Sequence, residues 1–165
     1  MHRDPMHDRA RELISELRLE PHPEGGYFRE IFRSAFKVQP LDDRSARSAL
    51  TTIYFLLLKG QHSRWHRVAS DEAWHFYEGD PLVVYWIDPQ NGVHEEVLAS
   101  GARKGRPVCV VPAGCWQAAK PRGEFSLAGC TVGPGFDFQD FEMVSPGSAM
   151  LARITALNPE FRELV

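Results

Sequence analysis

The sequence predicts an all-β protein, a sandwich or barrel of short antiparallel strands with short helices at its two ends. β-prone runs recur along the chain at intervals of about 8 to 12 residues, as in other all-β domains. Glycine- and proline-rich turn signals separate these runs. Helical periodicity of apolar residues occurs only near the two termini. A chain of 165 residues is long enough for one core, so we expect a single domain over 1–165.

The N-terminal region is expected to be helical after a disordered start. Residues 1–7 carry no packing pattern, and we expect them to be disordered. From Asp8, apolar residues such as Leu13 and Leu17 recur at helical spacing, which predicts an amphipathic helix over residues 8–19. Proline cannot continue a helical hydrogen-bond ladder, so Pro21 and Pro23 end it.

The barrel is expected over residues 24–144. Its first strand follows the Gly25-Gly26 pair and continues through Phe32, and a strongly apolar run predicts a central strand over 48–59. Seven further strands are predicted at Ser63–Val68, Glu72–Tyr77, Leu82–Ile87, His94–Leu98, Val108–Val111, Cys115–Ala119 and Phe125–Thr131.

Three segments remain outside the predicted strands and the N-terminal helix. Residues 37–48 have no packing pattern, so we expect an exposed connection, with a lid as the alternative. Asp137, Asp140 and Glu142 lie among phenylalanines, and their spacing favours a loop clamp or a subunit contact over a calcium site. Residues 148–165 are apolar enough to form a C-terminal helical segment.

Composition restricts the class of partner. A net charge of −3 and a pI near 6.2 give no broad basic face, so nucleic acid and anionic membrane are not expected partners, and a small molecule is. No apolar run approaches the roughly 18 residues of a membrane span, and the N-terminus does not resemble a signal peptide. Cys109, Cys115 and Cys130 are expected to be buried free thiols, which favours a cytoplasmic location.

Gly60 to Gly79 contains the residues best placed for chemistry. His66 and Glu72 lie between two glycine turns on short aromatic-rich strands, and strand parity directs both into the barrel. A later run, 111–117, adds Gln117. Histidine exchanges protons near neutral pH, and a neighbouring carboxylate orients it and favours its charged form. We therefore predict a catalytic pair of His66 and Glu72, with a buried structural pair as the alternative.

These motifs resemble those of the cupin superfamily. Gly60, His66, Glu72 and Gly79 are similar to its first motif, and Pro112-Ala-Gly114 with Gln117 is similar to its second. The finer signature resembles a cupin-like family of unknown function that occurs from bacteria to yeast, and its characteristic segments here are residues 21–30, 65–79, 111–119 and 129–142. The resemblance covers roughly residues 12–144. It implies a double-stranded β-helix, the cupin jelly-roll barrel, and a homodimer.

The resemblance also bears on metal binding. The usual cupin metal site takes two histidines, a glutamate and a third histidine from the second motif. Here the second and third histidine positions hold Val68 and Gln117. Transition metals favour imidazole nitrogens, so no metal and no other cofactor is expected; if a divalent metal is bound, its ligands would be His66, Glu72 and Gln117.

Four further side chains are candidates for contact with a ligand in the barrel: Tyr54, Trp74, Phe76 and Gln117. The alternative for each is core packing. Since metal-free cupins include nucleotide-sugar epimerases, the first hypothesis is a metal-independent sugar or nucleotide-sugar isomerase or epimerase. The alternatives are a non-catalytic small-molecule binding or sensor protein, and a metal-dependent cupin dioxygenase or isomerase.

Overall fold

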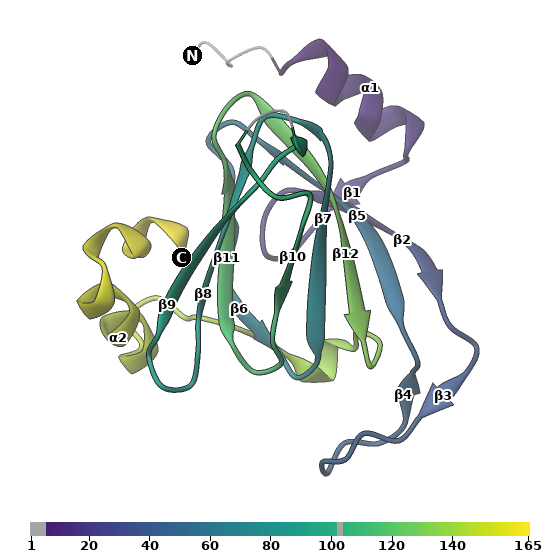
Figure 1. Cartoon of the computed structure of the whole chain (residues 1–165), viewed down its shortest axis with the longest axis vertical. Helices are drawn as coiled ribbons and strands as arrows, with labels where there is room; N and C mark the ends of the chain where they lie inside the picture. Colours follow the sequence, from purple (N-terminus) through teal and green to yellow (C-terminus); the bar gives the residue numbers. More distant parts are fainter. Residues whose placement is uncertain (1–5, 102–103) are drawn as a thin grey trace.

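The structure, a computed structural model, describes residues 6–101 and 104–165. Within these residues the strands form a six-stranded sheet in the order β1-β2-β5-β12-β7-β10 and a five-stranded sheet in the order β13-β6-β11-β8-β9. A small β3-β4 sheet extends from them, and Figure 1 shows the two main sheets facing each other. This is the jelly-roll barrel that the sequence predicts.

The strands have the following bounds: β1 Glu20–Pro21, β2 Tyr27–Arg33, β3 Lys37–Val38, β4 Arg47–Ser48, β5 Thr51–Leu58, β6 Ser63–Val68, β7 Asp71–Gly79, β8 Leu82–Ile87, β9 Val93–Leu98, β10 Val108–Val111, β11 Trp116–Pro121, β12 Phe125–Gly133 and β13 Phe141–Met143. All pairings between these strands are antiparallel.

The main core lies between the two sheets. Alternate side chains of β5 point inward, so Phe55 and Leu57 join Trp74 of β7 and Val84 of β8 in one buried cluster. Phe55 and Trp74 meet edge to face, with their ring centroids 5.8 Å apart. The period of two along each strand is the reason that apolar residues two positions apart share this core.

Helix α1 (Asp8–Glu16) covers the outer face of the six-stranded sheet. Its Ala10 and Leu13 pack on Leu56 of β5 and on Phe125 and Leu127 of β12. The predicted helix extended to residue 19 and was too long, because Leu17 is already the C-cap and the next residue, Arg18, has a φ of 51°. Beyond the helix, Leu19 packs against the sheet, and Arg18 is exposed.

The N-terminal prediction is tested only in part. Residues 1–5, most of the segment expected to be disordered, lie outside the described residues. His7 is ordered and caps α1, since its Nδ1 accepts a hydrogen bond from the Arg9 amide at 3.2 Å. Its ring also lies 5.2 Å from that of Phe125.

The C-terminal segment closes the other side of the barrel. It consists of α2 (Ala149–Leu157) and the short 3-10 helix η3 (Pro159–Leu164), which Asn158 separates. Phe161 packs on Trp65 of β6, and the Trp65 indole donates a hydrogen bond to the Phe161 carbonyl at 2.9 Å. The predicted helical segment over 148–165 is thus two short helices. No helix in the described part of the chain is long and apolar enough to cross a membrane.

Residues 34–50 form a projecting arm built on β3 and β4, in place of the patternless loop predicted over 37–48. The central strand predicted over 48–59 is correspondingly shorter, because Ser48 belongs to β4 and β5 begins at Thr51. The arm is fastened at its base, where the Ser34 amide bonds to the Leu50 carbonyl and the Ala49 amide to the Phe36 carbonyl.

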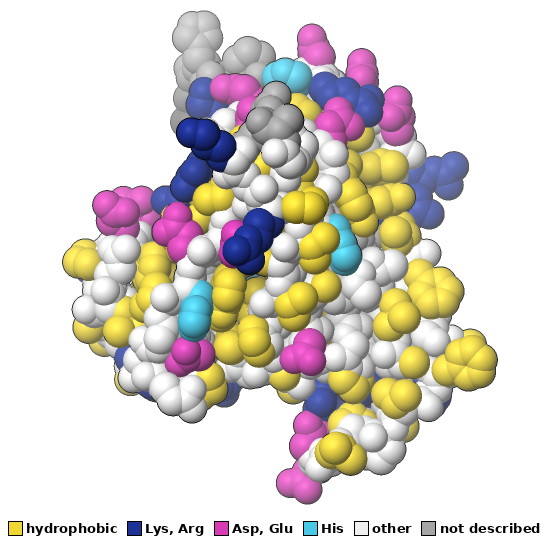
Figure 2. Space-filling view, viewed as in Figure 1, with side chains coloured by type: hydrophobic (Ala, Val, Ile, Leu, Met, Phe, Trp, Pro, Cys, Tyr) yellow, Lys and Arg dark blue, Asp and Glu magenta, His cyan; other side chains and the backbone are white. Residues whose placement is uncertain are grey.

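Strand β2 leaves most of its outer edge open, because β1 pairs only with Tyr27 and Phe28. Exposed apolar side chains follow this strand and the arm, including Ile31, Phe32, Phe36 and Leu41. Figure 2 shows hydrophobic side chains gathered on this side of the molecule. An open edge with an apolar surface is compatible with self-association, and the homodimer stays a prediction.

Candidate functional site

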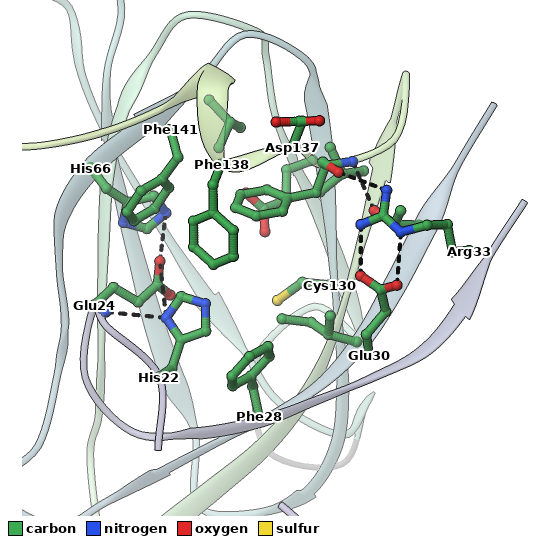
Figure 3. Close-up of a pocket in the computed structure, with 16 residues that line it drawn as sticks. His22, Glu24, Phe28, Glu30, Arg33, His66, Cys130, Asp137, Phe138 and Phe141 are labelled. Carbon is green, nitrogen blue, oxygen red and sulfur yellow. Dashed lines mark hydrogen bonds and ion pairs between the residues drawn. The ribbon is translucent and has the colours of Figure 1, made fainter. Parts of the chain in front are cut away.

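A cavity of about 250 Å³ opens between the two sheets (Figure 3). Side chains of β2, β5, β6, β7 and β12 form its walls, the turn before β2 forms another part, and the segment that carries the 3-10 helix η2 (Phe138–Asp140) covers it. The lining residues are His22, Glu24, Phe28, Glu30, Arg33, Thr51, Ile53, His66, Val68, Glu72, Cys130, Val132, Phe136, Asp137, Phe138 and Phe141.

His66 is held in one tautomer. Its side chain is 2% exposed, and its Nδ1 lies 2.7 Å from the carbonyl oxygen of Arg64. A carbonyl can only accept a hydrogen bond, so Nδ1 must carry a proton and donate it. In the neutral imidazole the other nitrogen, Nε2, therefore keeps its lone pair.

Glu24 supplies the partner of this second nitrogen. Its Oε2 lies 3.2 Å from His66 Nε2, while its Oε1 accepts a hydrogen bond from the Ser63 hydroxyl at 2.8 Å. The following glycine allows the turn that brings Glu24 inward: Gly25 has a φ of 107°, and a Cβ there would collide with the His62 carbonyl.

Burial controls the charge of this pair. It raises the pKa of Glu24 to about 8, against an opposing effect of the Ser63 hydrogen bond, and it lowers the pKa of His66, against the attraction of Glu72. Both directions favour the neutral forms at pH 7. One proton then lies between the two groups, donated by the Glu24 carboxyl to His66 Nε2.

His22 adds a second buried imidazole. The Glu24 amide donates a hydrogen bond to His22 Nδ1 at 3.1 Å, so neutral His22 carries its proton on Nε2. Burial, with a smaller contribution from His66, lowers the pKa of His22 to about 4. The ring meets Phe28 edge to face at 4.4 Å. His22 is therefore uncharged at neutral pH.

Glu72 belongs to a second hydrogen-bonded chain. Its Oε2 accepts from the Gln117 amide nitrogen at 2.7 Å, and Gln117 Oε1 accepts from the Trp74 indole at 2.9 Å. Burial raises the pKa of Glu72 to about 7, and Glu24 adds to the shift, although the electrostatic interaction with His66 and the Gln117 hydrogen bond oppose it. Glu72 thus has a pKa near neutral pH.

The structure changes the predicted pairing of His66 with Glu72. Both side chains are buried and line the cavity, as strand parity indicated. They belong to opposite sheets, however, and face each other across the interior. The hydrogen-bonding partner of His66 is Glu24, a residue that the sequence analysis did not select. Its one signal was a carboxylate followed by two glycines inside the motif at 21–30.

The four predicted ligand contacts lie elsewhere. Trp74 and Phe76 pack in the main core, and Gln117 lies behind Glu72 at 1% exposure. Tyr54 was expected to face inward, which is wrong: it faces outward, in the cluster beneath α1, with its ring 6.2 Å from that of Tyr77. None of the four is among the residues that line the cavity. The aromatic residues that line the cavity are instead phenylalanines from β2 and from residues 136–141.

The acidic cluster fastens the segment that covers the cavity. Arg47 donates to both carboxylate oxygens of Asp140 at 2.9 Å, and Arg44 reaches the same carboxylate at 3.2 Å. Both arginines belong to the projecting arm. The expected loop clamp is therefore present. A lid was the alternative interpretation of the arm, and in the structure the arm holds the covering segment in place.

The donor set does not fit a metal of the usual cupin kind. Val68 has no ligand atom, and the Gln117 oxygen is turned toward the Trp74 indole, which can only donate. In the described residues, no three side chains of the His, Cys, Asp or Glu type are arranged to hold a metal ion. The Gln117 oxygen is thus engaged by the Trp74 indole, which does not fit the conditional ligand set of His66, Glu72 and Gln117.

Two facing sheets around a central cavity with buried histidine and glutamate side chains define a cupin-type barrel. The chain belongs to the family described as Cupin superfamily (DUF985), whose model matches residues 11–144. The search of curated proteins finds no match.

Among the solved structures that match are two that cover more than nine-tenths of this chain. A hypothetical protein from Leishmania major is 33% identical, with 94% of this chain and 96% of that chain covered and a TM-score of 0.79. A protein from Shewanella oneidensis is 36% identical, with 93% and 92% covered and a TM-score of 0.75. Oxalate decarboxylase from Bacillus subtilis is 14% identical over 88% of this chain and 36% of its own, with a TM-score of 0.57, which shows the shared fold alone.

Proposed function

We propose that this protein is a metal-independent acid–base enzyme of the isomerase or epimerase class, acting on a small molecule in the barrel. The observation that carries the proposal is the contact of 3.2 Å between His66 Nε2 and Glu24 in the wall of the cavity, with the histidine tautomer fixed by the Arg64 carbonyl. If their role were only structural, the burial of Glu24, His66 and Glu72 would cost considerable free energy without a functional return.

Two protonation sites on opposite sheets suit such a reaction. Glu72, with a pKa of about 7, would take a proton from a carbon beside a substrate carbonyl, since a general base works best when its pKa is near the operating pH. The proton held between Glu24 and His66 would pass to the carbonyl oxygen. For an α-hydroxy carbonyl substrate, Glu72 would then return its proton to the former carbonyl carbon of the enediol, and the neighbouring hydroxyl would give its proton back to the Glu24–His66 pair. Both sites then regain their initial states.

The cavity restricts the size and charge of the substrate. A volume of about 250 Å³ holds a molecule the size of a monosaccharide, and the phenylalanine rings offer faces on which a sugar ring can stack. The buried carboxyl groups disfavour a phosphate in the interior. We therefore favour a small carbonyl or hydroxyl compound over a complete nucleotide-sugar.

Proton transfer to carbon can be detected without knowledge of the product. Purified protein in D₂O would be incubated with sugars, amino sugars and small carbonyl compounds, and deuterium at carbon would be measured by mass spectrometry. We expect incorporation into at least one compound class. Ligands that stabilise the protein thermally yet exchange no carbon-bound hydrogen would instead identify a non-catalytic binding or sensor protein, which the same aromatic-lined cavity would suit.

A further inference from the structure

Acidic side chains exceed basic ones around the cavity. Glu24 and Glu72 lie inside it, and Glu30 and Asp137 lie at its edge. The one guanidinium among the lining residues, that of Arg33, is already engaged: it donates to both oxygens of Glu30 at 2.9 and 2.8 Å and to the Phe136 carbonyl at 3.0 Å. The two imidazoles, His22 and His66, have lowered pKa values and add no positive charge at neutral pH.

Four phenylalanine rings share this cavity with the carboxyl groups. Phe136, Phe138 and Phe141 form a cluster with ring centroids 5.0 to 6.0 Å apart, and Phe28 belongs to the opposite wall. Figure 3 shows Phe28, Phe138 and Phe141 arranged around the central space. Phe138 is 58% exposed, although its segment is fastened by the Asp140 clamp.

We infer that the natural ligand carries a cationic nitrogen, an ammonium or substituted ammonium group on a small organic molecule, held between the phenylalanine faces and the buried carboxyl groups. The faces of aromatic rings are negative, so several rings around one position attract a cation. The buried carboxyl groups of Glu24 and Glu72, whose neighbours among the described residues are neutral at pH 7, complete its neutralisation when they ionise. The inference rests on the proposed function only in placing the substrate in this cavity, and it refines the class of substrate.

The raised pKa values of Glu24 and Glu72 agree with this assignment. Burial keeps a proton on a carboxyl group that has no cationic partner. A bound ammonium group would supply the missing charge, whereas an anionic ligand would face further repulsion. A neutral ligand of the same shape would gain only the contacts of its apolar surface.

Matched pairs of a cation and a neutral molecule of similar shape test the inference directly. Isothermal titration calorimetry would compare choline with 3,3-dimethyl-1-butanol, and benzylamine with benzyl alcohol, on the full-length protein at low ionic strength. We expect the cation of at least one pair to bind 10-fold or more tightly than its neutral partner. Equal or weaker binding of the cation in both pairs, or binding by none of the four probes, would overturn the inference.

Two variants assign the effect to particular groups. Phe138→Leu is expected to weaken binding of the cation about 3- to 10-fold and to change that of the neutral partner less than 2-fold. Phe36→Leu, at an exposed phenylalanine outside the cavity, is the matched control and should change neither. Equal weakening of cation and neutral partner by Phe138→Leu would contradict a cation-binding role of this ring.

Glu72→Gln tests the carboxyl group with little change of shape, because the introduced amide can still accept the Gln117 hydrogen bond. We expect the preference for the cation to fall below 3-fold, while Glu142→Gln, at the surface beside Arg67, leaves it unchanged. Persistence of the full preference in the Glu72 variant would contradict the assignment. Binding and exchange are separate readouts: binding of a cation without deuterium incorporation would overturn only the proposed enzyme, and exchange of neutral compounds alone would overturn only this inference.

Discussion

Replacement of His66 by alanine is expected to lower the rate of solvent deuterium incorporation by about 100-fold or more. The proton that passes to the carbonyl oxygen is held between Glu24 and His66 Nε2, so the acid side of the reaction loses one of its two groups. Folding should be retained, because Glu24 can keep its proton while it still accepts the Ser63 hydrogen bond, and the vacated volume adjoins a cavity. The expected loss of stability is about 1 to 3 kcal/mol.

His94 provides the matched control. It is a half-exposed histidine that bonds to Asp88 at the surface, and His94→Ala should change the exchange rate less than 2-fold. If His66→Ala fails to fold, His66→Gln keeps a polar side chain of similar reach and answers the same question. Exchange within 3-fold of the wild type, in a folded His66 variant, would show that this imidazole takes no part in the reaction.

Glu24→Gln is expected to lower the activity and to raise the stability of the folded protein. The introduced amide can accept from Ser63 and donate to His66 Nε2, and so imitates the protonated acid. Activity should fall because an amide cannot release its proton. Stability should rise at alkaline pH, since the wild-type carboxyl group must either keep its proton or ionise in a buried position.

The pH dependence follows from the raised pKa of Glu24. Between the unfolded value of 4.5 and the folded value of about 8, the folded protein holds a proton that the unfolded chain has released, so wild-type stability falls as the pH rises through this window. The variant lacks this slope. We expect it to match the wild type near pH 5 and to exceed it by roughly 3 to 4 kcal/mol at pH 8.

Denaturant unfolding at pH 5, 6, 7 and 8 would measure this difference. Glu124→Gln, at an exposed acid beside Lys59, serves as the control, and its free energy of unfolding should follow the wild type at each pH. A difference between Glu24→Gln and the wild type that stays constant from pH 5 to 8 would mean that Glu24 is ionised in the folded protein throughout.

The strands could be predicted well because turn signals bound them clearly. The bounds of β6, β8 and β10 agree with those expected, and α1 ends early only because of the left-handed backbone at Arg18. Strand β5 shows the limit of reasoning from parity. Its outer face is also apolar, since α1 covers it, so the alternation does not distinguish Tyr54 on the outer face from Phe55 on the inner one.

The residues of the site could be predicted only where they lie on regular strands. His66 and Glu72 line the cavity because parity on β6 and β7 sets their direction. Glu24 lies on an irregular turn, where no periodicity indicates the direction of a side chain, and its contact with His66 joins residues far apart in the sequence. The phenylalanines of residues 136–141 likewise reach the cavity through a segment whose course depends on the Asp140 clamp.

The neutral pair of Glu24 and His66 is the central claim, and the ¹⁵N chemical shifts of the His66 ring test it without any ligand. In histidine-labelled protein at pH 7, we predict a protonated Nδ1 and an unprotonated Nε2 that accepts a hydrogen bond. His66→Gln would assign the signals. A ring protonated on both nitrogens, or one protonated on Nε2 alone, would contradict the account.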